Sequence, residues 1–204
     1  MKPEGGVSDL AYSPDGEYLA TASGETGVQV WEASNGEEAA HMEPEGAVTT
    51  VAYSPDGQYL ATGSNDSVAR VWDVSSGEEE STMLHLGTVT AVAYSPDGKY
   101  LATASKDKTA RVWEVRTGEA VAGVRLERPQ EQVLDVEFSP DAKYLARTEN
   151  DGTVQTWKWT WLPRDLIVKA CSQLSRNLTR EEWQLYLPAE PYRNTCRKSL
   201  LKSN

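Results

Sequence analysis

The sequence is poor in cysteine, in histidine and in long apolar runs, and each shortage excludes a class of protein. Its 204 residues contain 2 Cys, Cys171 and Cys196, which is too few for a disulfide framework and agrees with a reducing compartment. With only 2 His, the chain offers a poor set of zinc ligands. No apolar stretch approaches the length of a membrane span, and the opening residues, MKPEGGVSDL, lack the apolar centre of a signal peptide. We therefore expect a cytoplasmic chain with no membrane partner, no metal and no cofactor.

Positive charge is also scarce over most of the chain. Residues 1–161 hold 12 Lys and Arg against 27 Asp and Glu, whereas residues 162–204 hold 8 against 4. An acidic body repels phosphate backbones, so we do not expect it to bind nucleic acid. For the basic tail we expect a solvated segment or an internal complement to the acidic body, with contact to RNA or an acidic surface as the alternative.

What the sequence does contain is a repeat of one pattern. Four near-copies read AYSPDGEYLAT, AYSPDGQYLAT, AYSPDGKYLAT and EFSPDAKYLAR, and their first aromatic residues are Tyr12, Tyr53, Tyr94 and Phe138. The copies are 41, 41 and 44 residues apart, and a tryptophan follows each aromatic by 19 residues: Trp31, Trp72, Trp113 and Trp157. A period in this range predicts a repeat architecture in which each unit is stabilised by its neighbours.

Each copy predicts a four-stranded antiparallel meander. In the second copy the expected strands are 48–54, 58–64, 68–74 and a weaker one at 80–86, separated by turn residues such as those of SPDG. Apolar residues are adjacent at Tyr59 and Leu60, so both faces of the sheet require burial. One face is expected to pack on the preceding unit and the other on the following unit, as in blades arranged around an axis.

This combination resembles the WD-repeat family of β-propellers over about residues 7–161. The third strand of each copy closes on the dipeptides Trp31-Glu32, Trp72-Asp73, Trp113-Glu114 and Trp157-Lys158, so three of the four keep the acid. The resemblance implies an all-β domain at 1–161 with four WD-type blades, at about 7–46, 47–87, 88–131 and 132–161.

The resemblance also implies a hydrogen-bonded set of His, Ser, Asp and Trp inside a blade. Only the third copy holds all four residues, namely His85, Ser105, Asp107 and Trp113. Such a buried set satisfies polar groups that otherwise cost about 1–3 kcal/mol each. A hydrolytic triad is the alternative for His, Ser and Asp, but the tryptophan completes the set within a sheet, which favours a structural role and no catalytic residue.

The number of blades does not complete a ring. Closed propellers have about 4–8 blades, and WD-type rings usually have more than four. The fourth copy supplies three strands before Pro163, and the six residues Met1–Gly6 are too few to supply the missing outer strand. We expect the C-terminal part of a longer propeller, with a ring shared by two chains as the alternative and a closed four-blade ring as the third choice. An open series would expose apolar faces that a second chain, absent sequence or the tail must cover.

The tail at 162–204 is predicted to be a small helical extension. Apolar residues between Leu166 and Leu174 follow a helical stripe, and Thr179 and Glu182 form a capping box. The segment DLIVKACSQLSRNLTREEWQLYLPAEPYRNTC resembles the end of many bacterial WD-repeat proteins that carry a STAND-type (NACHT-like) nucleotide-binding module or a peptidase. The resemblance implies an upstream NTPase domain, since the chain has no GxxxxGK[ST] motif.

These observations favour a non-catalytic binding or scaffold module for a protein or peptide ligand. In the larger proteins it resembles, such a propeller is expected to sense a signal and control an attached catalytic domain. Rigid loops at a propeller rim suit recognition, and the candidate binding residues there are Glu25, Thr49, Asn65, Thr90, Lys106 and Asn150. One alternative is a homo-oligomeric ring with a structural role, such as a homodimer. A propeller enzyme is the other, although no catalytic constellation appears outside the blade network.

Overall fold

The computed structural model describes residues 5–121 and 131–158. Every regular element in these ranges is a strand, and the four sheets they form belong to one compact unit. Within the same ranges, no helix has the length and apolar character needed to cross a bilayer. The predicted helical tail at 162–204, with both cysteines, lies outside the described residues.

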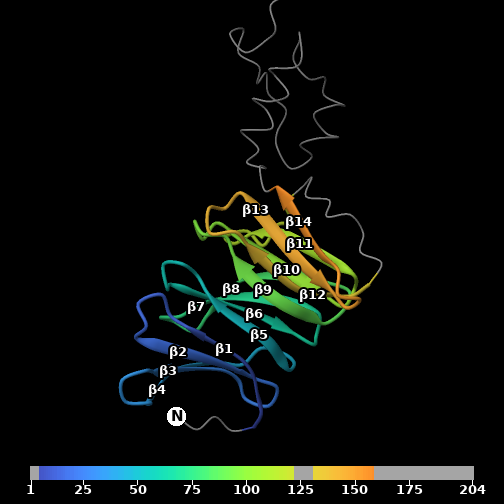
Figure 1. Ribbon diagram of the computed structural model, residues 1–204. Coiled ribbons are helices and arrows are strands. Elements are labelled where there is room, and N and C mark those ends of the chain that lie inside the picture. The colour runs from blue at the N-terminus through green and yellow to red at the C-terminus, as the bar shows by residue number, and fades with distance from the viewer. Residues whose placement is uncertain (1–4, 122–130, 159–204) are drawn as a thin grey trace, which may run out of the picture. The chain divides into compact units, whose positions relative to one another are not determined.

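Each repeat forms one antiparallel sheet, which we call a blade and number from one to four (Figure 1). Blade one consists of β1 (Val7–Tyr12), β2 (Tyr18–Ser23), β3 (Gly27–Glu32) and β4 (Glu38–Met42). Blade two consists of β5 (Val48–Tyr53), β6 (Tyr59–Ser64), β7 (Val68–Asp73) and β8 (Glu79–Leu84). Blade three consists of β9 (Val89–Tyr94), β10 (Tyr100–Ser105) and β11 (Thr109–Glu114), and blade four of β12 (Val133–Phe138), β13 (Tyr144–Glu149) and β14 (Val154–Lys158). The all-β fold with four blades is thus confirmed.

The fourth strand is present only in blades one and two of the described chain. In blade three an isolated bridge joins Trp113 to Ala120, at the position where β8 pairs with β7 in blade two.

In the SPDG turn between the first and second strands, Ser54 Oγ donates to Asp56 Oδ1 at 2.6 Å and accepts the Tyr59 N–H at 2.9 Å. Gly57 has φ of 74°, a left-handed conformation that glycine adopts without strain. This turn therefore reverses the chain in the same way in every blade.

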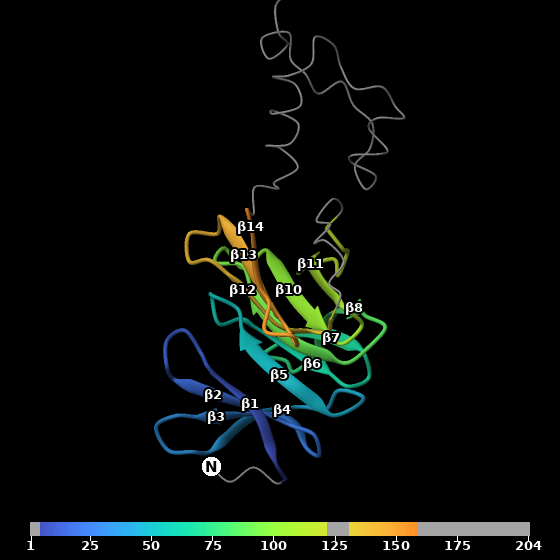
Figure 2. The same ribbon diagram turned by 45° about the vertical axis from the view of Figure 1, so that its right-hand side comes forward.

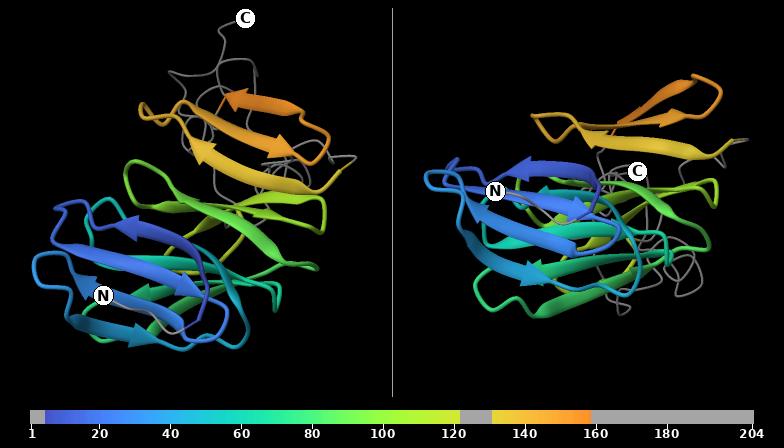
Figure 3. Two further views of the ribbon diagram at one scale, coloured as in Figure 1. Left: turned by 60° about the horizontal axis from the view of Figure 1, so that its bottom comes forward. Right: turned by 90° about the horizontal axis from the view of Figure 1, so that it is seen from below.

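Successive blades pack face to face, and we call the contact between two of them a seam. The first strands lie along one another in order, β1 on β5, β5 on β9 and β9 on β12 (Figures 2 and 3). The seam between blades one and two is an apolar cluster that includes Val30, Leu60 and Trp72. The next seam includes Val71, Leu101 and Trp113, so Trp72 and Trp113 each pack toward the preceding blade.

A hydroxyl crosses each seam at the same repeat position. Ser8, Thr49 and Thr90 donate to the backbone carbonyls of Val48, Val89 and Val133, at 2.7, 2.5 and 2.7 Å. Each bond joins a side chain of one blade to the backbone of the next, so it fixes the two blades against each other.

The series of blades is open among the described residues. β1 and β12, at the two ends of the series, do not pack together as neighbouring first strands do. The closed four-blade ring is therefore not formed by the described strands.

Candidate functional site

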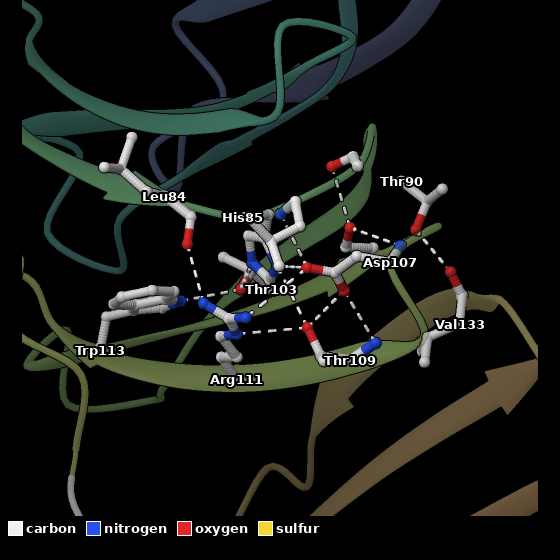
Figure 4. A network of polar contacts seen from close by, with 12 residues as sticks. Leu84, His85, Thr90, Thr103, Asp107, Thr109, Arg111, Trp113 and Val133 are labelled. Atoms are coloured by element: carbon white, nitrogen blue, oxygen red, sulfur yellow. Dashed lines mark hydrogen bonds and ion pairs between the residues drawn. The ribbon is translucent and has the colours of Figure 1, made fainter. Parts of the chain in front are cut away.

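A buried polar network joins four side chains of blade three (Figure 4). The indole N–H of Trp113 donates to Thr103 Oγ1 at 2.8 Å, and Thr103 Oγ1 lies 2.7 Å from His85 Nε2. His85 Nδ1 lies 3.2 Å from Asp107 Oδ2. The imidazole also meets the indole edge-on, with ring centroids 5.7 Å apart. Strands β10 and β11 supply Thr103 and Trp113, while His85 comes from the loop after β8.

The hydroxyl in this network belongs to Thr103, and the prediction that placed Ser105 there is wrong. Trp113 pairs directly with Leu101, so on that face of β10 the next hydroxyl along the strand is that of Thr103, two residues away. Ser105 lies two residues further, where its Oγ donates to the Gly87 carbonyl and accepts the Asp107 N–H. His85, Asp107 and Trp113 occupy the predicted places.

Burial determines the charge state of the network. Loss of solvent lowers the pKa of His85 to about 4, although the Asp107 carboxylate acts in the opposite direction. Burial opposes the charge of Asp107 as well, but the Leu86 N–H and the Thr109 hydroxyl outweigh it and hold its pKa below the ordinary value. At neutral pH the neutral His85 ring donates from Nδ1 to Asp107, and Nε2 accepts the Thr103 hydroxyl proton.

The same geometry argues against a hydrolytic role for these residues. The side chains of His85 and Asp107 are 0% and 4% exposed, and Thr103 is fully buried. The Thr103 oxygen already accepts the Trp113 indole, so no substrate atom can approach it. The arrangement therefore supports a structural network that joins the strands of blade three.

The other blades vary this arrangement at the same positions. Trp31 and Trp72 donate to Thr21 and Thr62, each at 2.9 Å, without a histidine. Blade four replaces the threonine with a buried arginine, described next.

In blade four, Arg147 forms a buried ion pair where the other blades hold threonine and serine. Arg147 Nη2 lies 2.8 Å from Glu149 Oε1 and donates to Gln155 Oε1 at 3.0 Å. Its guanidinium carbon lies 4.6 Å from the Trp157 ring centroid, within cation–π range. The sequence analysis did not predict this pair. The signal that could have revealed it is the arginine that replaces the threonine of the repeated Leu-Ala-Thr sequence.

Four of the six predicted binding residues are exposed at corresponding turns. They lie in the turns between the second and third strands of the four blades, and we call them the turn face: Glu25, Asn65, Lys106 and Asn150. Thr49 and Thr90 lie elsewhere, since they are half-buried and their hydroxyls cross the seams.

In blade two this turn is held by side-chain hydrogen bonds to the loop that precedes β5. Asn65 Oδ1 accepts the Ala47 N–H at 3.0 Å, and Ser64 Oγ donates to the Ala47 carbonyl at 3.1 Å. The turn face presents one carboxylate, one ammonium and two amides on this frame. A preformed set of charged and amide groups suits recognition of a polar partner surface.

In residues 5–121 and 131–158, no group of three or more His, Cys, Asp or Glu is placed to hold a metal ion. An open groove of about 620 Å³ lies between blades one and two, lined in part by Tyr18, Ala40, Gln58 and Val74. Gln58 belongs to an SPDG turn, at the strand end opposite the turn face.

Comparison with known proteins agrees with this architecture. The family described as WD domain, G-beta repeat matches residues 2–32, 37–73, 78–114 and 124–158. No curated protein matches the chain. Among solved structures, the crystal structure of the computationally designed Ika4 protein matches with a TM-score of 0.67 at 20% identity, covering 78% of this chain and 94% of that chain. At that identity the likeness concerns the fold alone.

Proposed function

Because this chain belongs to the WD domain, G-beta repeat family, we propose that it is a non-catalytic scaffold that binds a protein or peptide through its turn face. WD-repeat proteins generally act as interaction scaffolds and not as enzymes.

One observation carries this proposal: a constant frame presents variable exposed groups. The SPDG turn bonds recur at Ser13, Ser54, Ser95 and Ser139, and the indole-to-threonine bond recurs in three blades. At the other strand ends, the first turn residue instead varies, being Gly24, Asn65, Lys106 and Asn150, and Glu25 follows Gly24. Rigid frames with variable exposed turns are suited to specific recognition at little cost in conformational entropy.

Charge supports a partner with a basic surface. Residues 1–161 hold 27 acidic against 12 basic side chains, so their field attracts positive segments and repels nucleic acid. We propose that the partner contributes cationic side chains to Glu25 and hydrogen-bonding groups to the two asparagines.

We further propose that the chain is the C-terminal sensor propeller of a bacterial cytoplasmic signalling protein with an upstream STAND/NACHT-type NTPase domain. Support for this context is the resemblance of residues 165–196 to the ends of such proteins. An in-frame nucleotide-binding module encoded upstream of Met1 would agree with it, and a genomic stop codon with no such module would contradict it.

The turn face is tested by a matched pair of quadruple variants. The first changes Glu25, Asn65, Lys106 and Asn150 to alanine. The control changes the exposed SPDG-turn residues Glu17, Gln58, Lys99 and Lys143 to alanine, at the opposite strand ends. Both are compared with the wild type by quantitative affinity capture from a lysate of the source cells, and thermal unfolding checks that both fold.

We expect one or more proteins to be captured by the wild type and the control but lost with the turn-face variant. Purified partner should then bind at least tenfold more weakly to that variant in calorimetry. If every captured protein binds the two variants equally, the turn face is not the binding surface.

A further inference from the structure

Blade one exposes the face that, in each later blade, is covered by the preceding blade. Val7, Leu10 and Tyr12 of β1 are 43%, 57% and 61% exposed. The residues at the same repeat positions in blades two to four are covered. Tyr53 is half-buried, and the others are at most 9% exposed, namely Val48, Val51, Val89, Val92, Tyr94, Val133, Val136 and Phe138. In blades two and three these residues belong to the apolar clusters shared with the preceding blade, and in blade four their strand β12 lies against β9 and β10 of blade three. Blade one has no preceding blade among the described residues.

The fourth blade exposes the opposite face. Val154 of β14 is 65% exposed and Tyr144 of β13 is 47% exposed. The residues that match Val154 in blades one and two, Val28 and Ala69, are fully buried against the following blade.

These two faces are the two halves of one kind of seam. Val28 and Val51 belong to the same apolar cluster between blades one and two, and Ala69 and Val92 to the cluster between blades two and three. The same pairing in a further seam brings together Leu10 and Val154, which match these positions. One chain therefore carries both halves of a seam that it forms three times internally.

We propose that a second copy of this chain covers both faces, with blade one of each copy packed on blade four of the other. The two contacts are equivalent by a two-fold axis, so the assembly closes after two copies. Its eight blades lie within the range of known propellers. The proposal does not rest on the turn face, which lies at the strand ends and not on the blade faces.

The seam between copies is expected to be weaker than the internal seams. Leu134 stands where Ser8, Thr49 and Thr90 supply the hydroxyl that crosses a seam. Thr156 stands where the other blades hold a buried valine: Val30, Val71 and Val112. With one hydrogen bond and some apolar burial missing, the dimer should dissociate on dilution within the range that sedimentation measures.

The test uses two charge variants of the 204-residue chain, Leu10→Glu and Val154→Lys. Sedimentation equilibrium at about 0.15 M salt, where long-range repulsion is screened, is expected to give twice the monomer mass for the wild type. Each variant alone places a charge in both seams and should weaken the dimer at least a hundredfold. An equimolar mixture can form one unchanged seam and one seam that pairs the introduced carboxylate with the introduced ammonium, so the mixture should regain the dimer.

Because Leu10 and Val154 are exposed in the single chain, both variants should fold, which circular dichroism checks. Leu86→Glu is the control, since Leu86 is 90% exposed but lies after β8 and outside both faces; its dimer should match the wild type.

A wild type that stays monomeric at all concentrations would overturn the proposal, as would a mixture that regains no dimer. Pairing of two β1 faces would be recognised by a Val154→Lys variant that still dimerises, and it would also overturn the proposal. The turn-face quadruple variant should dimerise normally, so this test can fail or succeed independently of the proposed function.

Discussion

In three of the four blades, the threonine of the repeated Leu-Ala-Thr sequence accepts the indole N–H of the blade's tryptophan. In blade three the same hydroxyl also bonds His85, so one small side chain satisfies two buried groups. The network in blade three is therefore an extension of a simpler bond that the other blades already possess.

Replacing this threonine with valine should cost more in blade three than in blade two. Thr62→Val leaves only the Trp72 indole without its partner, which we expect to lower the free energy of unfolding by about 1–2 kcal/mol. Thr103→Val leaves both the Trp113 indole and His85 Nε2 without partners, so a loss of about 2–4 kcal/mol is expected. Urea denaturation measures both. Equal losses would show that His85 gains little from Thr103.

Acid should destabilise the protein through His85. The pKa of this ring falls from 6.5 in the unfolded chain to about 4 in the folded one, so the unfolded state binds more protons between these values. The stabilisation is complete at neutral pH and is lost as the pH falls toward 4. Between pH 7 and pH 5 we expect a loss of about 2 kcal/mol that a His85→Asn variant does not show. Parallel pH profiles for the two proteins would contradict this.

At the scale of elements, the strands and turns were predictable because their signals are local. The second copy predicts strands at 48–54, 58–64 and 68–74, and β5, β6 and β7 lie within those limits. The fourth strand had the weakest pattern, and it forms only in blades one and two of the described residues. Contacts across seams were not predictable, since a hydroxyl such as that of Thr49 looks like any exposed threonine until the neighbouring blade is placed.

In blade four, an alanine replaces the glycine of the SPDG turn, and this replacement leads to a testable prediction. Ala142 has φ of 54° where Gly16, Gly57 and Gly98 have φ of 74°, 74° and 70°. A left-handed conformation strains a residue with a Cβ by about 1–2 kcal/mol. Replacing that residue with glycine removes the strain, but the greater conformational freedom of glycine in the unfolded state offsets part of the gain in stability.

We therefore expect Ala142→Gly to raise the free energy of unfolding by about 0.5–1 kcal/mol. Gly16→Ala is the matched reverse change, because a Cβ at Gly16 meets no atom within 4 Å and tests the backbone strain alone. It should lower the free energy of unfolding by a similar amount. Thermal unfolding of both variants measures the effect, and a destabilising Ala142→Gly would contradict the strain argument.

At the scale of the whole molecule, the repeat period determines the fold but not the environment of each position. Tyr12, Tyr53 and Tyr94 occupy the same place in three copies, yet Tyr12 is 61% exposed and Tyr94 is 9% exposed. The hydroxyls of Tyr53 and Tyr94 are buried without a hydrogen-bond partner, and burial raises the pKa of Tyr53 to about 12. Phe138 fills this place in blade four without a hydroxyl. Sequence similarity alone could not distinguish a covered position from an uncovered one.

The position of a blade in the series should therefore decide the cost of truncating the aromatic residue at this repeat position. Phe138 is 4% exposed in the seam with blade three, so Phe138→Ala should lower the free energy of unfolding by about 3–5 kcal/mol. Tyr12→Ala removes an exposed ring and should cost less than about 0.5 kcal/mol in dilute solution, where the chain is monomeric. At concentrations where two copies associate, Tyr12→Ala should instead weaken the dimer, since its ring belongs to the face that the second copy covers. Urea denaturation at two protein concentrations separates these effects. A large cost for Tyr12→Ala in the dilute monomer would mean that the β1 face is already covered within a single chain.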